Sequence, residues 1–343
     1  MKNDVKNKSS FKKPTSAYAK SHKKTEKKIN KREIKEIKTL SEKLNPSGCV
    51  FVGTHLFSCG QKVPVFEIQT VHALNQVIGY AKFINRSSFD VYYRGECKLH
   101  DTVLPSLFRG KANCNHSSQR INTLIKKISD DDKMKHQLKL NNEDATNSTY
   151  VIEGMLQHYG VKTRFIDVVD NHWVALWMGL YKNKSYRQIL DYNHYIKRSI
   201  PLVDFANGGK SCTDEELYQY ILLVAVPKRW KQSIEGLYIA DDIVKIDLRK
   251  TLPSIFLRPH AQHGFVIRKK PKDSNFVSNF DFANNVIGIL KMRIDYVDEW
   301  IGTGNLLSQD NLFPAPAYDQ GYDILLSRTD LFAEKDFEIA RYI

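Results

Sequence analysis

Two short stretches place charged and hydrogen-bonding residues beside glycine, inside segments whose neighbours are apolar. Residues 92–96 have the sequence YYRGE, and residues 157–167 have the sequence QHYGVKTRFID. Burying arginine, histidine or aspartate costs several kcal/mol unless the group is paired or takes part in chemistry. A fold for this chain must therefore give these groups internal partners or gather them around a site.

The length and composition allow a sizeable core. The chain has 343 residues, of which 42% are hydrophobic and 11% aromatic, so one large domain or two ordinary ones can form. The spacing of apolar residues predicts the strands and the helices. The expected strands are 63–68, 91–95, 164–169, 221–226, 243–248, 265–268 and 286–292, and the expected helices are 71–84, 151–159, 171–181 and 294–300. This pattern predicts an α+β domain over 49–343, with a mixed, mainly antiparallel sheet, packed helices, and polar insertions near 111–148 and 183–217.

The positive charge is concentrated at the N-terminus. Residues 1–45 carry 15 Lys and Arg against 5 Asp and Glu, a net of +10 out of the +14 for the whole chain. We therefore assign residues 1–48 to a lysine-rich tail that is partly disordered and contains a helix near 25–44. Two interpretations stay open: residues 1–45 attach electrostatically to nucleic acid, or they form a solvated tail.

The cysteines and the hydropathy indicate a cytoplasmic protein with no membrane association. Five cysteines are an odd number, and no apolar segment follows the charged N-terminus. Cys97-x2-His100 and Cys114-x-His116 are the only hint of a metal, and their spacing matches no common zinc module, so no metal site is expected. No apolar run approaches the roughly 20 residues that a membrane-spanning helix needs.

Arg94 is the first candidate site residue, because it ends a tyrosine-rich strand beside Gly95. A guanidinium is a planar fork that suits phosphate or carboxylate, which favours an anion clamp. The alternative is an ion pair of Arg94 with Glu96 or Asp167 that only organises the fold.

The second stretch places an imidazole and a phenol at a helix end. His158 could be a satisfied core residue or a proton donor and acceptor. Polar residues follow it closely, up to Asn171, which we expect at the N-cap of the next helix. Gln262 and His263 form a third candidate before an apolar strand, with a simple polar loop as the alternative.

These segments, in this order, resemble the FRG domain, which is named for an aromatic-Arg-Gly sequence. The resemblance runs from about residue 70 to 318. It is carried by Tyr93-Arg94-Gly95, by 104–109 (LPSLFR), by 156–167, by Val174-Ala175-Leu176, by 261–265 (AQHGF) and by Leu312-Phe313-Pro314.

The resemblance implies a layout like that of ADP-ribosyltransferases, and NAD as the substrate. In those enzymes an early arginine or histidine grips NAD, a Ser/Thr precedes a helix, and a later glutamate holds the ribose. Arg94, Thr163 and the strand after Gln262 follow this order. The late glutamate is absent, so Glu96 or Asp167 would supply the carboxylate.

We thus hypothesise an enzyme that acts on a nucleotide-like molecule by ADP-ribosyl transfer or glycosidic cleavage. The resemblance further implies a toxin or phage-defence effector. A non-catalytic ligand sensor and a nucleic-acid-associated protein are the alternative hypotheses. The implied catalytic residues are Arg94, Glu96, His158 and Asp167. The implied substrate-binding residues are Tyr93, Tyr159, Thr163, Arg164, Asn171, Gln262 and His263.

Overall fold

The computed structural model describes residues 36–111, 113–140, 145–187, 191–200, 212–334 and 337–342. Ile37–Ile343 forms one compact unit, and the division from the preceding residues falls after Glu36. This unit contains all the elements described below, so it takes in residues 37–48, which the sequence assigned to the tail.

A ten-stranded sheet is the centre of this unit, in the order β1-β2-β12-β7-β3-β4-β11-β10-β9-β8. Its strands are β1 (Cys49–Leu56), β2 (Lys62–Ile68), β3 (Phe89–Glu96), β4 (Ile166–Val169), β7 (Tyr218–Pro227), β8 (Gln232–Ile234), β9 (Leu237–Ile239), β10 (Ile243–Asp247), β11 (Gly264–Lys269) and β12 (Val286–Arg293). Neighbouring strands are antiparallel except β2 and β12, which are parallel. The predicted α+β class with a mainly antiparallel sheet is confirmed.

Helices join and cover these strands. They are α2 (Val71–Asn85), α3 (Asn115–Asp130), α4 (Asp132–Leu138), α5 (Ala145–His158), α6 (His172–Leu180), α7 (Asp214–Leu217), α8 (Leu248–Thr251), α9 (Leu257–Ala261), α10 (Ile294–Ile301), α11 (Gln309–Leu312) and α12 (Gln320–Ser327). Short 3₁₀ turns are η1 (Ser106–Phe108), η3 (Val277–Phe280), η4 (Ala283–Asn285) and η5 (Asn305–Leu307). No helix of the described residues is long and apolar enough to cross a membrane.

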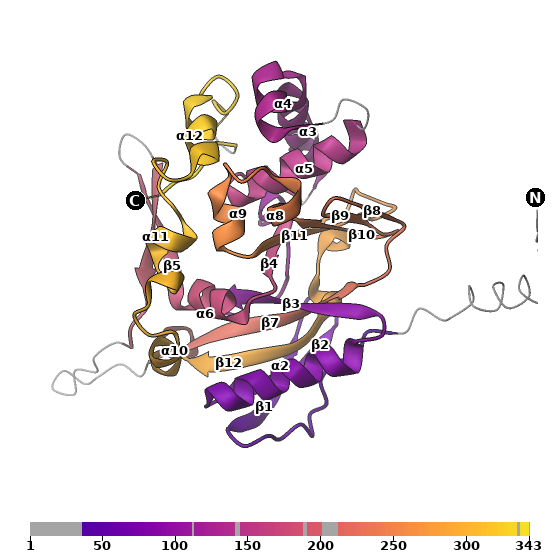
Figure 1. Cartoon of the computed structure of the whole chain (residues 1–343). Coiled ribbons are helices and arrows are strands. Elements are labelled where there is room, and N and C mark those ends of the chain that lie inside the picture. The colour runs from indigo at the N-terminus through magenta and orange to yellow at the C-terminus, as the bar shows by residue number, and fades with distance from the viewer. Residues whose placement is uncertain are drawn as a thin grey trace, which may run out of the picture. The chain divides into compact units, whose positions relative to one another are not determined.

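The two faces of the sheet bury different clusters. Successive side chains of a strand point to opposite faces, and in β7 Leu222 and Leu223 accordingly belong to separate clusters. The cluster that holds Leu222 contains no α-helical residue and draws on strands as distant in the sheet order as β2 and β10. The sheet therefore bends so that its two halves pack face to face. In Figure 1, β3, β7 and β12 lie low in the view, and β9, β10 and β11 lie above them.

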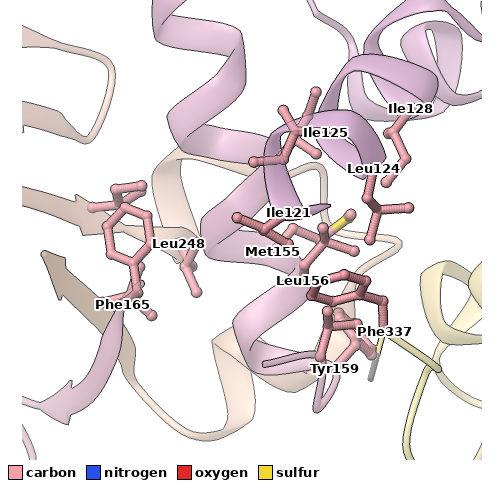
Figure 2. Packing of buried hydrophobic residues seen from close by; sticks show 14 of the residues in the cluster. Ile121, Leu124, Ile125, Ile128, Met155, Leu156, Tyr159, Phe165, Leu248 and Phe337 are labelled. Atoms are coloured by element: carbon pink, nitrogen blue, oxygen red, sulfur yellow. The ribbon is translucent and has the colours of Figure 1, made fainter. Parts of the chain in front are cut away.

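Helices α3, α4 and α5 cover the outer face of the β10–β11 half. Figure 2 shows Ile121 and Leu124 of α3 meeting Met155 and Leu156 of α5. All four side chains are at most 4% exposed. Within the predicted polar insertion near 111–148, α3 and α4 therefore contribute to the core, because α3 carries its apolar residues at helical spacing on one face.

Two strands that lie largely within the predicted polar insertion near 183–217 belong to a second, three-stranded sheet. Its strands are β5 (Tyr181–Arg187), β6 (Asp191–Lys197) and β13 (Arg341–Tyr342), in the order β13-β6-β5. The C-terminal strand thereby packs beside a hairpin that lies about 150 residues earlier in the chain.

The described part of the helix expected at 25–44 is not helical. Residues 36–44 have no regular secondary structure apart from a turn at 42–43. The backbone N–H of Leu40 donates to the carbonyl of Ile287 at 2.8 Å, and Lys38 exchanges two hydrogen bonds with the side chain of Asn85. Leu40 is 4% exposed and lies against Gly288. Bonds to β12 and α2 therefore replace the helical hydrogen bonds that the apolar spacing favoured.

Candidate functional site

A pocket forms where β3 and β4 separate. The two strands are neighbours, yet only Tyr93 and Val169 pair. Beyond this pair the backbones are not hydrogen-bonded to one another, and a pocket of about 420 Å³ opens beside them. Its lining comes from the ends of β3, β4 and α5, from α6, and from the smaller sheet. Among the predicted site residues, the lining includes Tyr93, Arg94, Glu96, His158, Asp167 and Gln262.

Arg94 bridges the gap between the two strands. Its Nε donates to Glu96 Oε1 at 2.6 Å, and a terminal nitrogen donates to the backbone carbonyl of Asp167 at 2.9 Å. Burial alone would lower the pKa of Arg94, but the charges of Glu96 and Asp167 and the hydrogen bond from Glu96 outweigh it and raise that pKa. Arg94 therefore stays charged and fixes Glu96 and β4 in place.

The Asp167 carboxylate is oriented by a chain of hydrogen bonds. Gln157 Nε2 donates to Asp167 Oδ2 at 2.7 Å. Thr163 Oγ1 donates to Gln157 Oε1 at 2.6 Å and accepts from the N–H of Phe165 at 3.1 Å. Asp167 Oδ1 has no hydrogen bond from the described residues, so one carboxylate oxygen is held while the other is free to meet a ligand.

His158 is buried and neutral at the pocket wall. The residue is 7% exposed, and neither ring nitrogen has a hydrogen-bond partner among the described residues. Burial lowers its pKa to about 4, although the charge of Asp167 acts in the opposite direction. Gly264 makes room for the ring, because a Cβ there would lie 2.2 Å from His158 Nε2. Near neutral pH the ring therefore offers one donor and one acceptor, without charge.

Aromatic rings form another part of the lining. Tyr195 lies 4.3 Å from Phe313 and is stacked on Tyr342 at 5.8 Å between ring centroids. Gln262 is fixed nearby, since its Nε2 donates to the carbonyl of Leu312 at 2.6 Å. The pocket thus combines flat apolar surfaces with charged groups, which is typical of sites for ligands with both an aromatic ring and anionic groups.

Sequence reasoning missed several residues of this lining. Gln157 is the first residue of the segment 157–167, and its position directly before His158 could have identified it as a candidate. Tyr195, Tyr342 and Arg198 gave no local signal, because they reach the pocket through the smaller sheet and the segment after it.

Arg164 and Tyr159 were expected to bind substrate, but the structure places both away from the pocket. Arg164 forms a buried, two-pronged ion pair with Glu153, through bonds of 2.8 and 2.7 Å, and Arg268 shares that carboxylate. Tyr159 is fully buried and donates to Asp319 at 2.8 Å. Internal charges and hydrogen bonds satisfy both side chains within the core.

Thr163, Asn171 and His263 also lie outside the lining. Thr163 is fully buried and acts through Gln157. Asn171 caps α6 by accepting from the N–H of Trp173 at 3.0 Å, as its position before the helix predicted. His263 is half exposed at its side chain, 3.4 Å from Asp170.

The two cysteines that hinted at a metal have other partners. Cys97 Sγ donates to the carbonyl of Tyr181 at 3.6 Å, and Cys114 Sγ to that of Asn275 at 3.3 Å. Within the described part of the chain, no group of three or more His, Cys, Asp or Glu side chains could hold a metal ion.

Comparison with known proteins places part of this site in one family. Residues 90–188 match the family model of the FRG domain. A search of curated proteins and a search of solved structures each returned no match. The matched range contains β3 from Asp90 onward, together with α5, β4 and α6, and with them Arg94, Glu96, His158 and Asp167. The chain is therefore an FRG domain-containing protein.

Proposed function

We propose that the pocket between β3 and β4 binds a nucleotide of the NAD type and cleaves its N-glycosidic bond, with water or a macromolecule as the acceptor. The observation that carries this proposal is the Asp167 carboxylate, which is held at Oδ2 by Gln157 and open at Oδ1. It lies in a pocket of about 420 Å³, a volume within the range of small-molecule sites.

Carboxylates are the groups that this reaction requires. Cleavage at the ribose C1′ passes through an oxocarbenium-like centre, which a nearby negative charge stabilises. Asp167 and Glu96 both line the pocket, and Arg94 ties them to one framework. They take the place of the late glutamate that the family resemblance led us to expect.

Nicotinamide, the leaving group, can depart without protonation by a general acid. Nicotinamide departs from its pyridinium form as a neutral molecule, because the electron pair of the broken bond neutralises the ring nitrogen. A neutral His158, with a pKa of about 4, suits this requirement. The aromatic lining formed by Tyr195, Phe313 and Tyr342 provides flat surfaces for a base.

The test is nicotinamide release from NAD, followed by chromatography. We expect Asp167→Asn to lower kcat by about 100-fold or more, as loss of an electrostatic stabiliser usually does. Asp170→Asn is the matched control, because Asp170 is three residues further on and outside the lining. Release that is equal in the wild type and Asp167→Asn would contradict the proposal.

A non-catalytic sensor is the second candidate, and one observation favours it. Gln262, in place of a late carboxylate, is neutral and its amide is already bound to Leu312. This alternative predicts that NAD binds with a measurable heat and is recovered intact, with no modified macromolecule.

A further inference from the structure

Positive side chains gather at the part of the pocket next to Cys97. Lys98, Lys182 and Arg198 all belong to the lining. Burial and the charge of Glu96 raise the pKa of Cys97, while the charges of Arg198 and Lys182 act on it in the opposite direction, which places both cations near its thiol. None of the three was singled out by the sequence.

Arg198 is held in place entirely by backbone carbonyls. Its guanidinium donates to Gly179 at 3.1 Å, to Tyr218 at 2.9 Å and to Glu215. No carboxylate pairs with it among the described residues. The side chain is therefore fixed at the pocket while its positive charge stays uncompensated.

The neighbouring lysines differ in their pairing. Lys98 lies 3.8 Å from the Glu215 carboxylate. Lys182 is exposed and has no ion pair within the described ranges. Lys182 and Arg198 therefore leave two positive charges unbalanced at this part of the pocket.

The charges around Arg94 are balanced instead. Arg94 is salt-bridged to Glu96 at 2.6 Å, and the Asp167 carboxylate lines the same region. An anion placed there would meet two carboxylates, and repulsion between like charges opposes it. The anion clamp that the sequence suggested at Arg94 is better matched by Arg198.

We propose that Arg198 and Lys182 form the subsite for the phosphate groups of the ligand, which turns its ribose toward Asp167 and Glu96. This inference rests on the proposed function for the identity of the ligand, but the anion subsite can be tested without any turnover.

The experiment is calorimetric titration with ADP, adenosine and inorganic pyrophosphate. Arg198→Gln should weaken the affinity for ADP and for pyrophosphate by about tenfold or more, because a charge-assisted contact is lost. The affinity for adenosine should stay unchanged. Lys182→Gln should weaken the affinity for the same two ligands by a smaller factor. Lys184→Gln, two residues further along β5 and outside the lining, is the matched control.

Arg198 also supports the local backbone, so thermal unfolding must accompany the titration. If Arg198→Gln does not fold, Lys182→Gln alone tests the subsite, since Lys182 is exposed and its replacement should not prevent folding. Unchanged ADP and pyrophosphate affinity in Lys182→Gln, or no binding of either ligand to the wild type, would overturn the subsite. ADP binding that depends on Arg198 without any cleavage of NAD would overturn only the proposed reaction.

Discussion

His158 shows how a single residue carries both a structural cost and a chemical property. Both ring nitrogens lack partners in the described structure, and a buried polar atom without a hydrogen bond costs about 1–3 kcal/mol. Such a cost is common at functional sites, where local rules are broken. The sequence indicated His158 by its setting, but not its burial, because Gly264 makes room for it from a distant strand.

The first prediction is a pH-dependent stability that originates at His158. Its pKa is about 4 in the folded state and 6.5 in the unfolded chain, so the unfolded chain binds more protons between these values. The free energy of unfolding should fall as the pH drops from 6.5 toward 4, by up to about 3 kcal/mol.

Denaturant unfolding at several pH values measures this effect. His158→Leu should flatten the dependence in that window. A His158→Leu variant with the full wild-type slope would show that other groups cause the loss.

The second prediction concerns Thr163, which we interpret as a positioning residue. Thr163→Val removes the donor to Gln157 and leaves the N–H of Phe165 without an acceptor, so stability should fall by about 1–3 kcal/mol. If Asp167 is thereby misplaced, kcat for NAD should fall about tenfold while KM changes little.

Thr163→Ser keeps both hydrogen bonds and should restore kcat. A purely structural role would instead lower stability in Thr163→Val without changing kcat. Steady-state kinetics and unfolding, measured on the same preparations, separate the two roles.

At the level of elements, α6 approaches β3 closely and thereby determines which residue fits near the end of the segment 92–96. A Cβ on Gly95 would lie 1.9 Å from the carbonyl oxygen of Ala175, so only glycine fits. The third prediction is that Gly95→Ala destabilises the protein by about 3 kcal/mol or more, as overpacking against backbone does.

Gly79→Ala is the matched control for this prediction. Gly79 lies within α2 with no atom within 4 Å of an added Cβ, so alanine should stabilise by about 0.5–1 kcal/mol. Chemical denaturation measures both. Equal stabilities of Gly95→Ala and the wild type would contradict the tight contact.

The regular elements were largely predictable, because their patterns are local. The spacing in α2 gave nearly the observed bounds, and the apolar run at 221–226 marked the central part of β7. Residues 36–44 were mispredicted as helix, since a 3.6-residue spacing cannot reveal that Leu40 hydrogen-bonds to β12. The core role of α3 was missed because its mean polarity concealed a single apolar face.

At the scale of the whole molecule, the pocket unites segments that are far apart in the chain. The sequence could indicate Arg94, His158 and Asp167, because charges beside glycine in apolar segments are locally visible. It could not indicate Arg198 or Tyr342, because the smaller sheet brings them in through long-range pairing.

The fourth prediction concerns the removal of residues 1–36. Residues 37–343 contain all the described clusters of buried apolar residues, so a protein lacking residues 1–36 should keep its thermal stability and its affinity for ADP. If the basic tail binds nucleic acid, this deletion should also remove a salt-sensitive affinity for DNA or RNA. Salt-insensitive nucleic-acid binding by the shortened protein would contradict a role of the tail.

The most direct test of the proposed pocket is a crystal structure with ADP-ribose bound. We expect density for the ligand between β3 and β4, with phosphate oxygens within hydrogen-bonding distance of Arg198 and the terminal ribose facing Asp167. Ligand density elsewhere on the molecule, or a pocket that stays empty at saturating ADP-ribose, would contradict it.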